Sequence, residues 1–409
     1  MASCKPMASA KHLLNLFTVI TSPVPDEILC RILSFVTTKE AISTSVLSKR
    51  WTHLCHRVPN LRFTDIKLNT VQSILDFNQS VYSVFVSRET AGSNSINQFH
   101  LHIQYSNGSH AYDHGFPHVR KWINLIVQRN LEHLHLHVDT SSIYSKLPTS
   151  MFICKTLVSL YLSESYIGFS SNEFQLPSLK TLHLEAIVFI EVRNFVWLIA
   201  GCPIIENLQV YDICCHGFDS LTIQEYKNLR FPRLIRAHIS EALCDFPAKA
   251  FTNSEFLSID TNTIMYTHDK LNQLKLPYDD IYIFHNLTHL EIQNNWDTVL
   301  RLLHLCPKLQ NLKLGQKYNV ANWDGEDDHE SFAEPEFVPQ CLLSYFRTCT
   351  IEDFLGRKHE FLLAEYILRN AQNLQTMTIR CYRKMLKLEK DLSECPKAST
   401  TCQLSVYIE

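Results

Sequence analysis

The chain has 409 residues, of which 45% are hydrophobic and 19% charged, and its formal net charge at pH 7 is -3. A chain of this length can form two or three domains or one repeat array. The balance of charge argues against a nucleic-acid binder, because phosphate contacts need a surplus of Lys and Arg on one face. The 14 cysteines are scattered without a CxxC pair, so we expect reduced thiols, no metal, and a location in the cytoplasm and/or nucleus.

Residues 1–20 are expected to form an N-terminal tail. The run HLLNLFTVI at residues 12–20 is the one segment that could be mistaken for a targeting sequence. Asn15 interrupts this run and no small-residue cleavage site follows it, which argues against a signal peptide. Because no stretch approaches the roughly 18 apolar residues of a membrane span, we expect a soluble protein without a membrane partner.

Residues 21–63 carry the signals of three short helices. Pro25 suits the first position of a helix, and apolar residues then recur with helical period, namely Ile28, Leu29, Ile32 and Leu33. Thr37 and Glu40 have the spacing of a capping box, and Ser48 can cap a third helix. A unit of this size buries little surface on its own. Its apolar stripes are therefore expected to pack on the rest of the chain or on a partner.

The run VPDEILCRILSF, followed by TKEAISTSVLSKRW, resembles the F-box and in particular its plant form. One departure is Val24, where that family usually has Leu. The resemblance implies binding to the Skp-family adaptor of an SCF ubiquitin ligase and, through the adaptor, to a cullin. The matching positions are Pro25, Ile28, Leu29, Ile32, Leu33, Val46, Leu47 and Trp51. Several of them are expected to be internal core of the F-box, and a cap that only seals the neighbouring domain is the alternative.

Residues 64–321 repeat a phrase of the form L-x-x-L-x-L. Clear copies begin at Leu131, Leu157, Leu179, Ile205, Leu287 and Leu309, and weaker copies lie at Ile96, at Leu234 and near Phe256. Spacings of about 20 to 29 residues are typical of leucine-rich repeats, in which each unit gives one parallel strand and a return segment. We therefore expect one curved solenoid whose parallel sheet forms the concave face.

The residues between and beside the last two apolar positions of each copy should lie on that concave face. This face is rich in His and Tyr, and the candidate substrate-binding residues are His100, His102, His135, His137, Tyr161, His183, Glu185, Tyr211 and His238. They form either a solvated surface without a role or a partner-binding patch, since the alternation LEHLHLHV does not specifically supply a metal site. If the first two units are adjacent, His100 should lie near His135, and His102 near His137.

Residues 322–336, NWDGEDDHESFAEPE, predict an exposed acidic linker. Residues 337–409 show a helical pattern that ends near Asn370, followed by a strand through Leu374, Met377 and Ile379. This segment resembles the FBD domain found at the C-terminus of plant F-box proteins. The predicted fold class is therefore α/β: a three-helix F-box, a leucine-rich-repeat solenoid and a C-terminal α+β FBD cap.

No catalytic motif stands out from the sequence. There is no G-x-S-x-G, no H-E-x-x-H and no glycine-rich phosphate loop, and the chain has only nine glycines. We therefore expect a non-catalytic adaptor without a cofactor: the substrate-recognition subunit of an SCF-type E3 ligase, whose repeats hold an unknown target protein. The alternative is a leucine-rich-repeat scaffold or small-ligand sensor whose F-box no longer reaches the adaptor.

Overall fold

The computed structural model describes residues 24–93, 95–140, 145–168, 174–215, 229–242, 248–260, 283–293, 296–315, 335–381 and 386–408. The tail expected at residues 1–20 and most of the linker expected at 322–336 lie outside the described residues. The chain forms two compact units, Met1–Leu179 and Lys180–Glu409.

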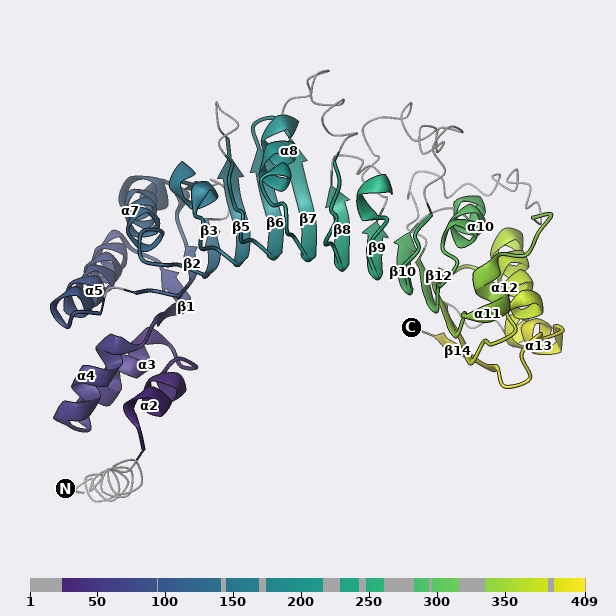
Figure 1. Ribbon diagram of the computed structural model, residues 1–409, viewed down its shortest axis with the longest axis horizontal. Coiled ribbons are helices and arrows are strands. Elements are labelled where there is room, and N and C mark those ends of the chain that lie inside the picture. The colour runs from purple at the N-terminus through teal and green to yellow at the C-terminus, as the bar shows by residue number, and fades with distance from the viewer. Residues whose placement is uncertain are drawn as a thin grey trace, which may run out of the picture. The chain divides into compact units, whose positions relative to one another are not determined.

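The first unit begins with the three predicted helices (Figure 1). These are α2 (Asp26–Leu33), α3 (Thr38–Ser43) and α4 (Lys49–Arg57), with a 3-10 turn at Thr44–Val46. The predicted capping box is present, because the Thr37 hydroxyl accepts the Glu40 N–H at 3.3 Å and the Glu40 carboxylate accepts the Thr37 N–H at 2.9 Å. Ser48 precedes α4 as expected, although its side chain makes no capping hydrogen bond.

A parallel sheet follows the helices in the same unit. Its elements are β1 (Asn60–Leu68), α5 (Val71–Thr90), β2 (Gln98–Tyr105), α6 (Gly108–His110), α7 (Phe116–Ile126), β3 (His133–Asp139), β4 (Ser145–Lys146) and β5 (Ser159–Ile167). Strands β1, β2, β3 and β5 pair side by side, and β4 pairs with β5. Helices α5 and α7 cover one face of this sheet (Figure 1). Alternate residues of each strand, such as Phe99, Leu101 and Ile103, are fully buried beneath them, as strand geometry requires.

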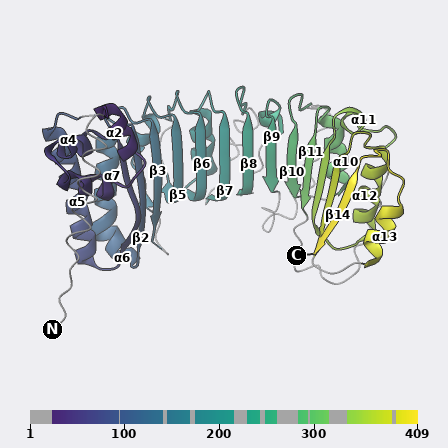
Figure 2. The same ribbon diagram turned by 90° about the horizontal axis from the view of Figure 1, so that it is seen from below.

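The second unit continues the same pattern. Its first part contains β6 (Thr181–Phe189), α8 (Val192–Ala200), β7 (Asn207–Cys215), β8 (Arg236–Ala242), β9 (Phe256–Asp260), β10 (His289–Gln293), α10 (Trp296–Leu305) and β11 (Asn311–Gly315). These strands pair in parallel and in chain order (Figure 2). Each predicted copy of the leucine phrase therefore supplies one strand, including the weak copy near Phe256, and the predicted α/β fold class is confirmed.

The C-terminal segment, expected as an α+β cap, extends this sheet by three further strands. It contains α11 (Gln340–Ser344), β12 (Thr348–Phe354), α12 (Lys358–Asn370), β13 (Thr376–Cys381), α13 (Leu386–Glu394) and β14 (Gln403–Ile408). Strand β12 pairs with β11, β13 with β12, and β14 with β13, all in parallel. Helix α12 ends at Asn370 as predicted. The segment thus repeats the strand-and-helix alternation of the chain before it.

A left-handed backbone conformation recurs near the end of several strands. The residues with positive φ within strands are Asp65, Glu164, Ala186, Asp212 and Asp353, with φ between 48° and 59°. In each case the residue stands two positions after a buried apolar residue, such as Leu184 before Ala186 and Val210 before Asp212. The backbone therefore bends at a similar place in these strands, as it does at a β-bulge.

Candidate interaction surfaces

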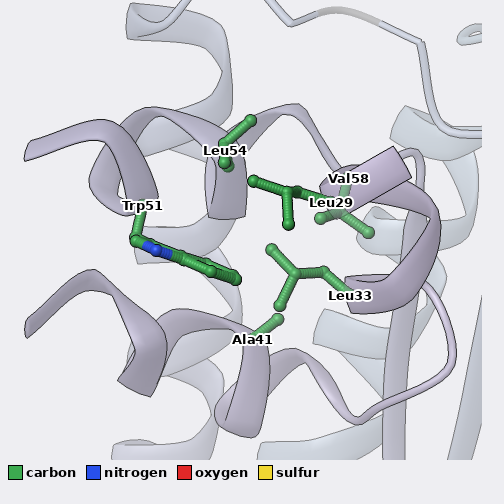
Figure 3. Close-up of a cluster of buried hydrophobic side chains, with 6 residues drawn as sticks. All are labelled: Leu29, Leu33, Ala41, Trp51, Leu54 and Val58. Carbon is green, nitrogen blue, oxygen red and sulfur yellow. The ribbon is translucent and has the colours of Figure 1, made fainter. Parts of the chain in front are cut away.

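The three N-terminal helices enclose a small apolar core of their own. Its side chains point toward one another in Figure 3 and are Leu29, Leu33, Ala41, Trp51, Leu54 and Val58. Leu29, Leu33 and Trp51 are only 1%, 3% and 5% exposed. These three predicted adaptor positions are therefore core residues and offer no surface to a partner.

The other predicted adaptor residues leave several apolar side chains in solvent. Ile28 is 48% exposed, Ile32 53% and Val46 79%. Pro25 is also exposed, whereas Leu47 is half-buried against the core. The sequence prediction did not include Phe35, which is 69% exposed. Its spacing of three residues from Ile32 and seven from Ile28 could have indicated its place on the strip. We call Pro25, Ile28, Ile32, Phe35 and Val46 the apolar strip.

A partly exposed ion pair joins the first helix to the third. The Arg50 guanidinium donates to the Asp26 carboxylate through Nε at 2.9 Å and Nη2 at 2.6 Å, and to the carbonyl of Val24. Arg57 lies 3.9 Å from the same carboxylate. These contacts fix the chain on either side of Pro25, at the start of the apolar strip.

The helical unit is also attached to the sheet of the first unit by buried polar contacts. The Arg88 guanidinium of α5 is almost fully buried and donates to the carbonyls of Val58 and, at 2.8 Å, of Ser95. Burial, and then the charge of Arg129, lowers the pKa of Arg88 to about 10. The Thr38 hydroxyl accepts the backbone N–H of Arg62 in β1 at 2.7 Å. The three-helix unit and the first strand are thus one packed structure.

On the sheet face opposite α5 and α7, the first unit carries five of the nine candidate substrate-binding residues. The rings of His100 and His135 lie 3.9 Å apart and those of His135 and Tyr161 3.8 Å apart, the latter pair within 3° of parallel. We call His100, His135 and Tyr161 the ring ladder. His102 and His137 are also neighbours, at 4.5 Å with their rings nearly perpendicular. The predicted proximity of the two histidine pairs is therefore confirmed.

These histidines have polar and charged neighbours. His137 Nδ1 lies in hydrogen-bond contact with the Ser163 hydroxyl, and His102 Nδ1 lies 3.7 Å from the Asp65 carboxylate. Burial, and then the positive charge of Arg62, lowers the pKa of His100 to about 4. His100 is therefore neutral at pH 7, with one nitrogen that donates and one that accepts.

The second unit carries the other four candidate residues on its own sheet. His183 Nδ1 is hydrogen-bonded to the amide oxygen of Gln209, and its Nε2 lies 3.5 Å from the Glu185 carboxylate. The ring of Tyr211 lies 5.2 Å from that of His183 and 4.7 Å from that of His238. Burial, followed by the negative charges of Glu185 and Glu291, raises the pKa of Tyr211.

Other kinds of site receive no support from the described part of the chain. Among those residues, no group of three or more His, Cys, Asp and Glu side chains is placed to hold a metal ion. Burial raises the pKa of the Cys202 thiol to about 12 and raises that of Cys306 as well, so neither is an activated nucleophile at neutral pH. Within the same described ranges, none of the helices is long and apolar enough to cross a membrane.

Comparison with known proteins identifies three domain types along the chain. Family models match the F-box domain at residues 22–63, the leucine-rich repeats of FBD-associated F-box protein At5g56370 at residues 119–246, and FBD at residues 334–379. The chain thus has the F-box, leucine-rich-repeat and FBD composition that its sequence predicts.

Relatives in Arabidopsis thaliana align with almost the whole chain. FBD-associated F-box protein At4g10400 is 29% identical over 440 residues, which cover 94% of this chain and 98% of the relative. F-box/FBD/LRR-repeat protein At4g00160 is 28% identical over 432 residues, or 93% of each chain. The chain is homologous to these plant F-box proteins over 93–94% of its length.

Proposed function

We propose that the chain is the substrate-recognition subunit of an SCF-type E3 ubiquitin ligase, acting in the cytoplasm and/or nucleus. Its F-box docks on a Skp-family adaptor, which joins it to a cullin, and its sheet faces bind a target protein. The chain supplies no catalytic side chain. It raises the rate of ubiquitin transfer by holding the target near a charged conjugating enzyme, which is an effect of effective concentration.

The observation that carries this proposal is the apolar strip beside a complete internal core. The F-box has its own buried cluster and is anchored to the sheet through Arg88 and Thr38. Exposure of Ile28, Ile32, Phe35 and Val46 is therefore not needed to fill that core. A strip of large apolar side chains next to a fully packed core is typical of a surface that binds another protein.

The test is assembly from purified components. The full chain is co-expressed with a Skp-family adaptor, mixed with a cullin, and analysed by gel filtration. We expect one complex in which all three proteins co-elute. If the chain elutes alone while the adaptor still binds an established F-box protein, the chain is a leucine-rich-repeat scaffold and the proposal is wrong.

A further inference from the structure

The last strand of the second unit has one backbone edge that pairs with no other strand among the described residues. Strand β14 pairs in register with β13 along all six of its residues, without a bulge. The Gln403 N–H is donated toward β13, to the carbonyl of Gln375. Because backbone groups alternate in direction along a strand, those of Leu404, Val406 and Ile408 point away from β13. We call the backbone of these three residues the β14 edge.

The apolar layer beneath the sheet is also incomplete at this strand. The β13 residues in register with the three edge residues are at most 1% exposed, namely Met377, Ile379 and Cys381. By contrast, Leu404 and Val406 are only half-buried, and Ile408 is 56% exposed. A further strand beside β14 would therefore cover apolar side chains as well as pair the backbone groups.

Strand β14 lacks the features that keep strand edges from pairing. Natural sheets protect their edges with charged side chains, prolines, bulges or a covering segment, but β14 reads QLSVYI, without a charged residue or a proline. Strand β1 of the first unit is protected in three ways. It contains charged side chains, its register shifts at a bulge, and the Thr38 hydroxyl accepts the N–H of Arg62. The β14 edge is therefore the one suited to strand pairing.

We propose that the β14 edge pairs with the β14 edge of a second copy of this chain, antiparallel and about a two-fold axis at Val406. In the register that uses the whole edge, Val406 lies opposite Val406 of the second copy, and Leu404 lies opposite Ile408. Residues placed in this way exchange both of their backbone hydrogen bonds. Their side chains form apolar cross-strand pairs, which extend the apolar layer of β13.

The distribution of charge favours a second copy as the occupant of this edge. Arg380 is the one charged residue of β13 and β14 together. In the dimer its two copies are three strand spacings apart, or about 14 Å, which exceeds the Debye length of about 8 Å at physiological salt. Like charges therefore do not oppose the pairing. A charged segment of another protein would find no opposite charge on β14, whereas a copy of β14 supplies apolar side chains in matching register.

The symmetry of this contact limits its size and gives it a consequence beyond the proposed function. Both copies use the same edge, so the contact is closed once two chains have met, and association ends at the dimer. The dimer carries two copies of every other binding surface of the chain. It therefore binds a repeated or dimeric target with higher avidity than one chain does.

The test measures the mass of the full chain in solution by sedimentation equilibrium between about 1 and 100 μM. One edge strand makes a small interface compared with the roughly 1,200–2,000 Å² of stable complexes. We therefore expect a reversible dimer with a Kd of about 10 μM. The average mass should rise with concentration from that of one chain toward that of two, without larger species.

Variants connect dimer formation to the β14 edge. Val406→Pro removes the central outward N–H but no hydrogen bond to β13, since proline is tolerated where the N–H points out of the sheet. Ile408→Lys adds a charge at an exposed position of the edge. Each should raise the Kd at least about ten-fold, with thermal unfolding recorded to show that the variant is folded. The matched control is Leu343→Lys on α11, a 40% exposed apolar residue of the same unit, which should dimerise like the original chain.

A mixing experiment tests the position of the two-fold axis. Val406→Lys and Val406→Glu each place like charges opposite one another at the axis, so each variant alone should be monomeric. An equimolar mixture places opposite charges there and should form a dimer. The proposal is overturned if the mixture dimerises no better than either variant alone, or if Val406→Pro and Ile408→Lys dimerise like the original chain. It is also overturned if the original chain remains monomeric at about 100 μM, which would leave the edge to an extended segment of another protein.

Discussion

Ile32→Glu should abolish adaptor binding while leaving the fold intact. Complete burial of an Ile side chain contributes about 1.5–3 kcal/mol, and 53% of Ile32 is still exposed in the free chain. Docking can therefore gain about 1 kcal/mol from this residue. A carboxylate in its place must also lose water without a partner, which costs several kcal/mol more. The sum is at least about 3 kcal/mol, or more than a 100-fold rise in Kd.

The measurement is a titration of the purified Skp-family adaptor against the full chain, with thermal unfolding recorded for each variant. Val86→Glu on α5 is the matched control, because Val86 is a similarly exposed apolar residue of the same unit outside the F-box. Leu29→Ala should behave differently, since loss of this core side chain lowers the free energy of unfolding by about 2–5 kcal/mol. A Kd for Ile32→Glu within two-fold of the original, with unchanged unfolding, would refute the assignment of the apolar strip.

Three further predictions concern the stability of the first unit. Arg88→Met should lower the free energy of unfolding by about 2–4 kcal/mol, because the carbonyls of Val58 and Ser95 lose a buried charged donor. Urea denaturation measures this free energy, and a change below about 0.5 kcal/mol would contradict the prediction. Thr37→Ala removes one side of the capping box and should cost about 1 kcal/mol in the same assay. Lys39→Ala, at an exposed position of the same helix α3, serves as its control. His100 has a pKa of about 4 in the folded chain and an ordinary value near 6.5 when unfolded, so the unfolded state takes up the proton first and stability should fall as the pH drops from 6.5 toward 4. Because His100 is half-buried, its contribution to the loss of unfolding free energy between pH 7 and 5 is at most about 2 kcal/mol. His100→Phe should reduce this acid-induced loss, which urea denaturation measures. An identical loss in both proteins would show that another group is responsible.

The helices and most strands could be predicted because each has a local signal. The capping box of Thr37 and Glu40 and the leucine phrases depend on residues close together in sequence. By contrast, Ile28 and Leu29 are adjacent apolar residues of one helix, and only the packing of α3 and α4 decides that Leu29 is buried and Ile28 is not. The same lack of tertiary information explains why Leu33 and Trp51 stood among the adaptor positions and Phe35 did not.

Two other parts of the structure had signals too weak to interpret. Strand β12 reads TCTIEDF, in which Cys349 and Ile351 replace the leucines of the phrase. The C-terminal segment therefore showed one strand in its sequence where the structure has three. Strand β1 begins at Asn60, inside the range assigned to the F-box, so the sequence did not indicate that Arg62 belongs to the sheet. Its place beside His100 depends on strand pairing between residues 38 positions apart in the chain.

The in-register pairing of the strands constrains how a chain of this kind can change length in evolution. One residue added inside a strand would turn every following core side chain toward solvent, and the left-handed residue near the strand end would move as well. Residues added between strands leave the pairing untouched. The alignment with At4g10400 runs over 440 positions against 409 in this chain, so gaps are necessary, and we expect them to fall in the connecting segments. Natural selection can thus lengthen or shorten the connections of this protein while the spacing of the side chains along its strands stays fixed.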